Sequence, residues 1–330
     1  MTAASSKPSR SSPLTTDCGK KMNRYLLETD QNQCYTEDGR SAPCKNSGQD
    51  ACCQKFYYLS GRQRFQVIDQ VVRDNLTGAV WSRNANPAEY PLTWKEALAY
   101  VADMLARRAH EYDNWQLPSR CLLFSLISHQ NINPALPDGH PFDNVFPGYY
   151  WSADSCRRLP DQAWYVHVGG GRVHRGMKHG SYMVWPMSQR NQKPVVPGHT
   201  EKMRFTAEHA WVRDTRTGLI WSKDANLAGR PLTWQETLSM VDALNREHFG
   251  GYRDWRLPNI RELESLVDLS SHSPALPTGH PFVNLQDAYW SSTTSVYELR
   301  YAWTLYSRDG IVGVGFKPGD DFFLWPVRNG

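Results

Sequence analysis

The chain has 330 residues, of which 40% are apolar and 13 are tryptophan, enough to fill substantial cores, and this excludes a wholly disordered protein. No stretch approaches about 18 consecutive apolar residues and the mean hydropathy is -0.61, which excludes a membrane-spanning helix. The 37 Lys and Arg against 33 Asp and Glu leave a net charge of +4, too small a bias to indicate nucleic acid as the partner. Any polyanion site must therefore be local.

Cysteines are concentrated near the N-terminus, where five of the seven lie within the first 53 residues: Cys18, Cys34, Cys44, Cys52 and Cys53. Their spacing lacks the paired pattern of a zinc site, so it favours a disulfide-rich module over a metal centre. Disulfides form in oxidising compartments, which predicts an extracellular or cell-surface protein, although residues 1–16 show no apolar core of a secretory signal. Because the number of cysteines is odd, at least one thiol stays unpaired or forms a disulfide with another chain.

A long internal repeat organises the rest of the chain. Residues 74–82 return 140 positions later as 214–222, and further matching segments keep this register. A repeat of this length is a duplicated domain, since solenoid repeats run about 20 to 50 residues. We expect the following parts: a mobile arm at 1–17, a cysteine-rich module at 18–62, domains at 63–188 and 203–330, and a linker at 189–202.

Each repeat is predicted to contain two helices. Thr93 and Glu96 form a capping box, as do Thr233 and Glu236, and an apolar stripe follows the first box. The members of that stripe are Trp94, Ala97, Leu98, Val101 and Leu105. A second helix is predicted after Pro258, where Asn259 caps it and Glu262 closes the box.

The second helix of the first repeat starts less favourably, and strands follow it. Ser119 caps this helix, but Leu122 stands where the glutamate of a capping box belongs. Short aromatic strands are predicted at 149–152, 163–168 and 182–187 and at their equivalents. Two helices packed on short antiparallel strands make each repeat an α+β domain. Recurring tryptophans are predicted to be mostly buried: Trp81, Trp94, Trp115, Trp164, Trp221, Trp234, Trp255 and Trp303.

The ordered motifs D-x-x-T-G-x-x-W, L-T-W-x-E, W-R-L-P-N-x-x-E-L, Y-W-S-S and W-P-V-R resemble the C-terminal domain of the Legionella collagen-like adhesin family. The resemblance covers both repeats, and in the first one Gln116 and Leu122 replace an Arg and a Glu of the pattern. It implies two tandem C-type-lectin-like domains, related in outline to formylglycine-generating enzymes. It also implies a bacterial surface or secreted protein that binds glycans or other extracellular ligands, with variable positions in the last strands and loops.

Candidate catalytic groups are few. Cys121 and Cys156 belong to one repeat, and we favour a disulfide between them over a catalytic pair. His140 and His280 recur in Gly-His-Pro-Phe, where a hydrogen-bonded loop histidine is favoured over a base or a ligand. No nucleophile elbow of the G-x-S-x-G kind occurs. We therefore predict no enzyme and no catalytic residue.

Metal binding has weak support from the sequence. His167, His174 and His179 occur in one repeat only, and spacing across a hairpin does not show whether they converge. Calcium would use carboxylates, for which the candidates are Asp309, Asp320 and Asp321, but the E-P-N and W-N-D triplets of calcium-dependent sugar binding are missing. We predict no cofactor.

Charge separates the two repeats. Residues 156–190 carry six basic side chains against one acidic one, whereas residues 295–330 carry four of each. Arginine and lysine grip sulfate or carboxylate by charge-assisted hydrogen bonds, while a solvated basic face is the structural alternative. The predicted ligand-binding residues are Arg172, Arg175, Lys178 and Tyr165 in the first repeat, and Arg300, Tyr301, Arg308 and Lys317 in the second.

Three functions follow from these observations. The leading hypothesis is a non-enzymatic extracellular binding protein, an adhesin for a glycan, a polyanion or a surface protein. The alternative is a structural subunit of an extracellular filament, self-assembled through the cysteine-rich N-terminal segment. A formylglycine-generating type of enzyme comes third. No nucleic acid partner and no membrane span are expected.

Overall fold

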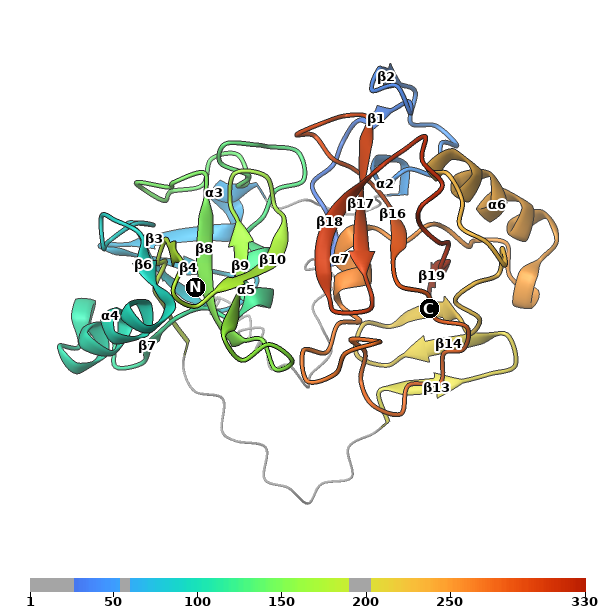
Figure 1. Cartoon of the computed structure of the whole chain (residues 1–330). Helices are drawn as coiled ribbons and strands as arrows, with labels where there is room; N and C mark the ends of the chain where they lie inside the picture. The colour runs from blue at the N-terminus through green and yellow to red at the C-terminus, as the bar shows by residue number, and fades with distance from the viewer. Residues whose placement is uncertain (1–26, 54–59, 190–202) are drawn as a thin grey trace, which may run out of the picture.

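The computed structural model describes residues 27–53, 60–189 and 203–330, and it shows two similar α+β halves side by side (Figure 1). Residues 1–26, 54–59 and 190–202 lie outside the described part. The expected arm at 1–17, Cys18 and nearly all of the expected linker fall there.

Each half begins with antiparallel strands that its last strand completes. In the first half β3 (Phe65–Ile68), β4 (Val71–Asp74) and β5 (Val80–Ser82) are joined by β12 (Met187–Ser188) and β7 (Trp115–Gln116). In the second half β13 (Phe205–Ala207), β14 (Trp211–Asp214) and β15 (Leu219–Ser222) are joined by β19 (Val327–Asn329). The pairing of β12 with β5, and of β19 with β15, brings the end of each repeat next to its beginning.

The long helices α4 (Trp94–Ala106) and α6 (Trp234–Arg246) start at the predicted capping boxes. The hydroxyl of Thr93 accepts from the backbone N–H of Glu96, and the carboxylate of Glu96 accepts from the backbone N–H of Thr93. The predicted apolar stripe of α4 is wrong at its end. Met104 is buried there and Leu105 is 39% exposed, because the buried face of the helix is centred on Ala97, Val101 and Met104, and Leu105 lies on its flank, seven residues after the half-buried Leu98.

The second helices start where the sequence predicted, and both are short. Asn259 caps α7 (Ile260–Glu264) with a complete capping box, whereas α5 (Arg120–Ser125) has only the Ser119 side-chain cap. In the second half Arg256 forms a bidentate ion pair with Glu262, with both N–O distances 2.6 Å. Gln116 and Leu122 occupy these positions in the first half, so the first half lacks this ion pair. Short 3₁₀ turns (Ala109–Glu111 and Phe249–Gly251) follow α4 and α6.

A single six-stranded antiparallel sheet runs through both halves. Its order is β16 (Tyr289–Thr294), β17 (Tyr301–Tyr306), β18 (Ile311–Phe316), β10 (Val173–Met177), β9 (Gln162–His167) and β8 (Tyr149–Ser155). The two halves meet where Val173 of β10 pairs with Val312 of β18. These strands lie next to one another across the middle of the molecule, with α4 and α6 at opposite ends (Figure 1). The short pair β6 (Leu92–Thr93) and β11 (Ser181–Tyr182) lies beside this sheet in the first half.

One hydrophobic core continues across the junction. It contains Trp81 and Trp164 of the first half together with Trp221 and Trp303 of the second, while smaller clusters pack under α4 and α6 separately. Seven of the eight tryptophans predicted to be buried are at most 3% exposed, and Trp94 is half-buried. The sequence predicted that these tryptophans are buried in two separate domains. The shared sheet and the core that continues across both halves correct that prediction.

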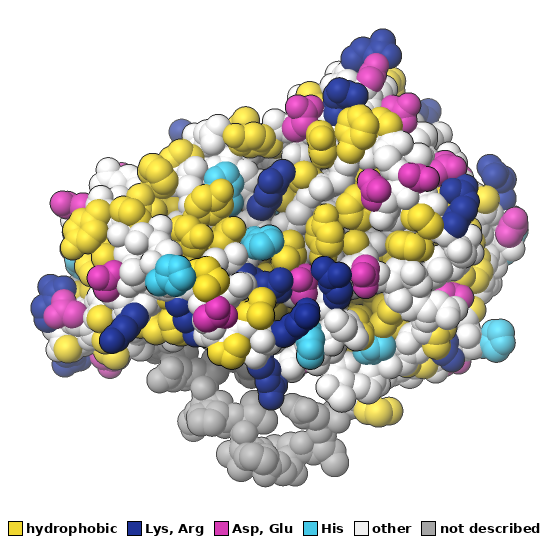
Figure 2. Space-filling view, in the orientation of Figure 1, with side chains coloured by type: hydrophobic (Ala, Val, Ile, Leu, Met, Phe, Trp, Pro, Cys, Tyr) yellow, Lys and Arg dark blue, Asp and Glu magenta, His cyan; other side chains and the backbone are white. Residues whose placement is uncertain are grey.

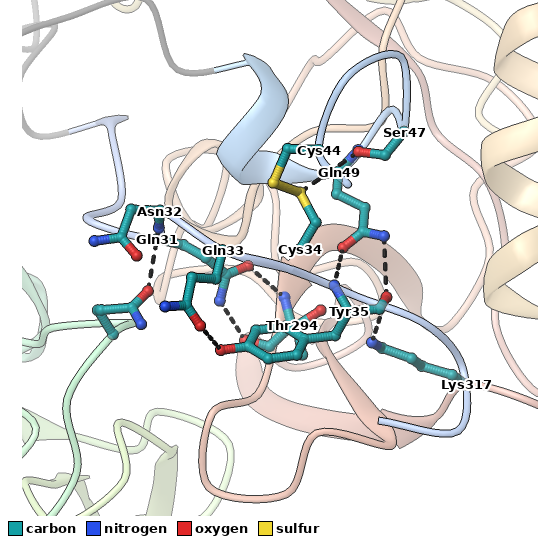
Figure 3. Close-up of a disulfide and its surroundings, with 11 residues drawn as sticks. Gln31, Asn32, Gln33, Cys34, Tyr35, Cys44, Ser47, Gln49, Thr294 and Lys317 are labelled. Atoms are coloured by element: carbon teal, nitrogen blue, oxygen red, sulfur yellow. Dashed lines mark hydrogen bonds between the residues drawn. A yellow bond between two sulfur atoms is a disulfide. The ribbon is translucent and has the colours of Figure 1, made fainter. Parts of the chain in front are cut away.

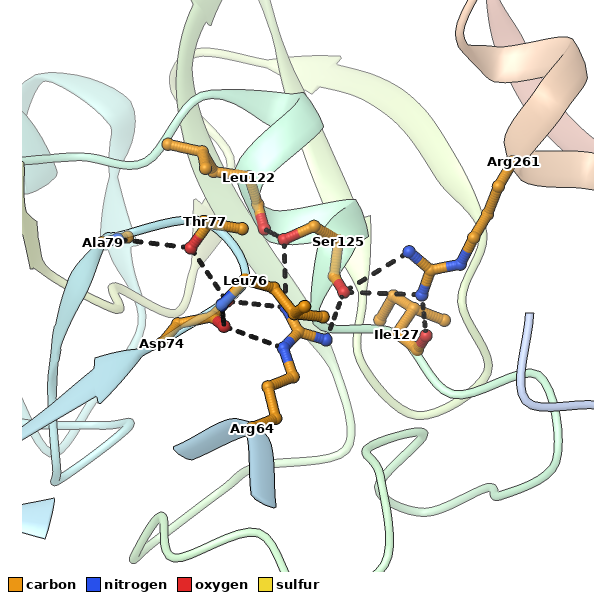
Figure 4. A network of polar contacts seen from close by, with 9 residues as sticks. All are labelled: Arg64, Asp74, Leu76, Thr77, Ala79, Leu122, Ser125, Ile127 and Arg261. Carbon is orange, nitrogen blue, oxygen red and sulfur yellow. Dashed lines mark hydrogen bonds and ion pairs between the residues drawn. The ribbon is translucent and has the colours of Figure 1, made fainter. Parts of the chain in front are cut away.

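Buried polar contacts also cross the junction (Figure 4). Arg64, at the end of α3 (Gly61–Arg64), forms a bidentate ion pair with Asp74 and donates to the Ser125 carbonyl. Arg261 of α7 donates to the carbonyls of Ser125 and Ile127 from the other side. Because these carbonyls end a helix and lack helical partners, arginine donors from both halves stabilise the junction.

We predict that Gly171→Ala destabilises the protein more than Gly218→Ala. Both glycines have positive φ (86° and 78°), which costs an alanine about 1–2 kcal/mol. A Cβ at Gly171 would lie 2.8 Å from Ile127 Cγ2 and 3.3 Å from Trp303 Cη2, whereas nothing lies within 4 Å at Gly218. Overpacking adds about 1–3 kcal/mol at Gly171.

Urea unfolding of both variants measures this difference. Equal losses in free energy of unfolding would show that the two halves do not pack at Gly171.

Candidate ligand-binding face

Three tyrosines of the first half lie together on the outer face of the sheet: Tyr149 of β8, Tyr165 of β9 and Tyr182 of β11. The ring centroids are 4.9 Å apart for Tyr149 and Tyr165, 5.3 Å for Tyr149 and Tyr182, and 4.9 Å for Tyr165 and Tyr182. Tyr149 is 44% exposed, and the other two are half-buried. We call these three residues the tyrosine platform.

Strand alternation and one glycine produce this platform. Successive side chains of a strand point to opposite faces, so Trp164 and Val166 enter the core while Tyr165 faces outward. Tyr182 lies over Gly176, where an added Cβ would meet its hydroxyl at 2.6 Å. The Trp151 ring supports Tyr182 at a centroid distance of 4.4 Å. The platform therefore rests on a rigid base.

Histidine and arginine border the platform. The His167 ring lies 4.8 Å from the Tyr149 ring, and His174 lies 6.1 Å from Tyr165. Burial raises the pKa of Tyr165 to about 12, an effect strengthened by Tyr182 and Tyr149 and opposed by Arg172. Burial and the nearby Arg172 lower the pKa of His167. At neutral pH Tyr165 is thus a protonated phenol and His167 is neutral, and the exposed Arg172 lies beside them.

The space-filling view shows yellow side chains gathered over the β8–β10 side of the front face, with basic and histidine side chains among them (Figure 2). The second half has no such platform. The equivalents of Tyr149, Tyr165 and Tyr182 are Ala288, Thr304 and Phe322, which are 6%, 0% and 7% exposed. The two halves share a scaffold but differ on this face.

The family comparison agrees with the repeated architecture. The model of the Lcl C-terminal domain matches residues 70–188 and residues 210–328. The chain belongs to this family. The resemblance predicted from the sequence is thereby confirmed, with one Lcl domain in each half. No curated protein matches the chain.

The predicted basic residues of the first Lcl domain serve different contacts. Arg172 is exposed next to the platform. Arg175 forms an ion pair of 2.9 Å with Asp309 of the second Lcl domain, which neutralises its charge. Lys178 Nζ donates to Ser155 Oγ and to the Pro160 carbonyl. Of the residues predicted to bind a ligand in this domain, the structure brings Tyr165 and Arg172 close together.

A hollow between the two Lcl domains adds cations that the prediction left out. This cavity of about 280 Å³ is lined by Arg157, Arg158 and Arg175, with His272 and Asp309 from the second domain. Arg157 donates to the Ser270 carbonyl across the junction. Basic residues at 157 and 158 were visible in the sequence, but their position opposite His272 follows from the shared sheet.

The predicted binding residues of the second Lcl domain mostly make internal contacts. Arg300 lies 4.9 Å from the centre of the Phe316 ring, and Tyr301 packs on the same ring. Arg308 pairs with Asp287 at 3.6 Å between exposed side chains. Lys317 is fully buried, so it lies out of reach of an outside ligand in this conformation.

Residues 27–53, which we call the cysteine-rich segment, cover Lys317 (Figure 3). The segment contains β1 (Cys34–Tyr35), β2 (Ser41–Ala42), α2 (Asp50–Cys53) and a Cys34–Cys44 disulfide. Lys317 Nζ donates to the carbonyls of Tyr35 and Thr36. The Gln31 side chain accepts from the N–H of Thr294 through Oε1 and donates to the Thr294 carbonyl through Nε2. The segment is therefore docked on the second Lcl domain.

The predicted disulfides are realised only at Cys34 and Cys44 in the described residues. Cys52 and Cys53 are thiols, and burial raises the pKa of Cys53 to about 11. The favoured Cys121–Cys156 disulfide is wrong: no bond joins the two sulfur atoms, and Cys121 is exposed on α5 while Cys156 is buried after β8. Sequence spacing did not reveal these opposite environments.

The structure also places the remaining candidates for chemistry. His140 Nδ1 accepts from the backbone N–H of Phe142 at 3.3 Å, and His280 stacks on Phe282, as expected of loop histidines. Within residues 27–53, 60–189 and 203–330, no three His, Cys, Asp or Glu side chains are grouped to hold a metal ion. None of the helices in these ranges is long and apolar enough to cross a membrane.

We predict that Lys317→Met changes how stability depends on pH. Burial lowers the pKa of Lys317 from 10.5 to about 7, with Glu37 opposing the shift. Between these values the unfolded chain binds a proton that the folded chain does not, so this lysine makes stability rise with pH from about 7 upward. Below about 7 both states are protonated and its destabilising effect is constant.

Urea midpoints of the unaltered protein and the variant, measured from pH 6.5 to 8.5, test this expectation. The variant should be more stable at pH 6.5, and its advantage should shrink as the pH rises. An advantage that stays constant would show that Lys317 keeps its ordinary pKa.

Proposed function

We propose that this chain is a non-enzymatic, extracellular or cell-surface binding protein whose first Lcl domain binds an acidic glycan on the tyrosine platform. The observation that carries the proposal is the group of three partly exposed tyrosine rings beside Arg172. Exposed apolar surface gathered on one face is typical of binding sites, because most folded proteins cover it. A platform on these strands is consistent with the resemblance to C-type-lectin-like domains, which implies a ligand site in the last strands and loops.

The chemistry of the platform suits a sulfated or carboxylated sugar. Tyrosine rings offer apolar faces to the C–H groups of a sugar ring, and their hydroxyls offer hydrogen bonds. Arg172 can donate a charge-assisted pair of hydrogen bonds to a sulfate or carboxylate. The cations of the junction cavity, Arg157 and Arg158, supply further positive charge on the same chain.

The disulfide and the family membership support the location. A Cys34–Cys44 bond suits an oxidising compartment. The Lcl C-terminal domain is not known as an enzyme family, and binding on the platform requires no cofactor. The filament alternative would use the cysteine-rich segment to join copies, but its described part is docked on its own chain, so we develop the binding function.

Binding of a heparin-derived hexasaccharide tests this function. Tyr165→Ala should weaken binding by about tenfold, since loss of one aromatic contact costs on the order of 1.4 kcal/mol. Arg172→Ala should weaken binding and reduce its dependence on salt, because exposed charges are screened beyond about 8 Å at physiological ionic strength.

The matched control is Tyr90→Ala, because Tyr90 is a 62% exposed tyrosine of the same domain outside the platform. It should leave the dissociation constant unchanged. Equal losses for Tyr90→Ala and Tyr165→Ala, or none for Tyr165→Ala and Arg172→Ala, would exclude the platform as the binding site.

A further inference from the structure

The docked cysteine-rich segment covers a face of the second Lcl domain formed by Trp234, Leu238 and Lys317. These three side chains are 0%, 4% and 0% exposed. Gly48 lies against Leu238, where an added Cβ would be 3.3 Å from Leu238 Cδ2. Together with the two carbonyls on Lys317 Nζ, this contact shows what the face accepts: a tight polypeptide loop that offers backbone oxygens and a small residue.

The first Lcl domain carries the same face, and no segment of the described residues covers it. Trp94, Leu98 and Lys178 are the equivalents, and all three are half-buried rather than buried. We call these three residues the docking face. The lysine lies over the indole at 4.3 Å here and at 4.2 Å in the second domain.

The backbone supports this equivalence. Trp94 N–H donates to the Lys178 carbonyl at 3.0 Å, and Trp234 N–H donates to the Lys317 carbonyl at 3.0 Å. Both tryptophans open helices of the same length behind the same capping box. The two faces therefore share these contacts, and within the described residues they differ in whether a segment lies on them.

We propose that the docking face binds a loop of another protein whose chemistry resembles residues 34–49. Such a loop presents backbone carbonyls to Lys178 and a glycine or another small residue to Leu98. Lys178 Nζ has two acceptors, Ser155 Oγ at 2.7 Å and the Pro160 carbonyl at 2.6 Å. An ammonium group has three donors, so one donor is available to the incoming loop.

A polypeptide is favoured over a sugar at this face. The one occupant that the structure shows on such a face is a peptide loop closed by a disulfide. Its closure limits the conformational entropy lost on binding, so a similarly closed loop is the expected partner. This inference does not depend on glycan binding at the tyrosine platform.

A synthetic peptide of residues 32–50 with the Cys34–Cys44 disulfide is the direct probe. The protein's own segment occupies the second domain at an effective concentration in the millimolar range, so added labelled peptide reports on the first domain. Fluorescence anisotropy with the full chain should show saturable binding. Reduction of the peptide's disulfide should weaken that binding, since the open peptide loses more entropy.

Leu98→Glu should weaken peptide binding at least about tenfold, because it puts a charge against the loop. Leu105→Glu is the matched control: it makes the same change on the same helix, at a leucine that is 39% exposed and outside the docking face. Lys178→Met is a second variant that removes the donor while keeping an apolar stem over Trp94. Circular dichroism checks that each variant is folded.

We expect loss of peptide binding in Leu98→Glu, weaker peptide binding in Lys178→Met and unchanged peptide binding in Leu105→Glu. Binding of the heparin hexasaccharide should be unchanged in these variants. Absence of saturable peptide binding would overturn the proposal. Binding that survives both docking-face variants, or falls equally in the Leu105→Glu control, would overturn it as well. Failure of the hexasaccharide alone would instead count against the tyrosine platform.

Discussion

The pairing of β10 with β18 joins the two repeats and positions the contacts between them. It turns the sheets of two repeats into one sheet and places Val173 against Val312 at its centre. Edge strands carry unpaired N–H and C=O groups, and the pairing at Val173 and Val312 means that neither β10 nor β18 is an edge strand of the sheet. The shared core, the Arg175–Asp309 ion pair and the basic junction cavity all follow from this contact.

Duplication on such a junction allows the two Lcl domains to keep their core and change their faces. The buried tryptophans and the capping boxes are the same in both. The outer face carries Tyr149 and Tyr165 in one domain and Ala288 and Thr304 in the other, and the cysteine-rich segment covers only the second. The tyrosine platform and the docking face of the first domain thus correspond to buried residues in the second.

The sequence predicted what local pattern determines. Capping boxes depend on residues three positions apart, the repeat register follows from comparing two segments of the sequence, and the burial of tryptophan follows from its large apolar ring. These expectations agree with the structure. Leu105 fits the helical period as well as Met104 does, but the period does not show which flank of the apolar stripe faces the core, and the structure buries Met104. The α+β class and the family followed from repeated motifs for the same reason.

Contacts between distant residues were not predictable in this way. Asp309 neutralises Arg175 from 134 positions away, and Gln31 bonds Thr294 from 263 positions away. Neither partner carries a pattern that names the other. Tyr165 was a candidate from its place among basic residues, but Tyr149 and Tyr182 join it only through strand alternation and the close approach of Tyr182 to Gly176.

Binding stoichiometry shows whether the faces of the two Lcl domains have diverged in what they bind. Isothermal titration of the full chain with a heparin-derived hexasaccharide counts the sites that one molecule offers. We expect one hexasaccharide per chain, because the tyrosine platform lies on the first Lcl domain and its equivalents in the second are buried. Two equivalent sites per chain would contradict it, since they would show that the conserved scaffold, and not the diverged face, binds the ligand.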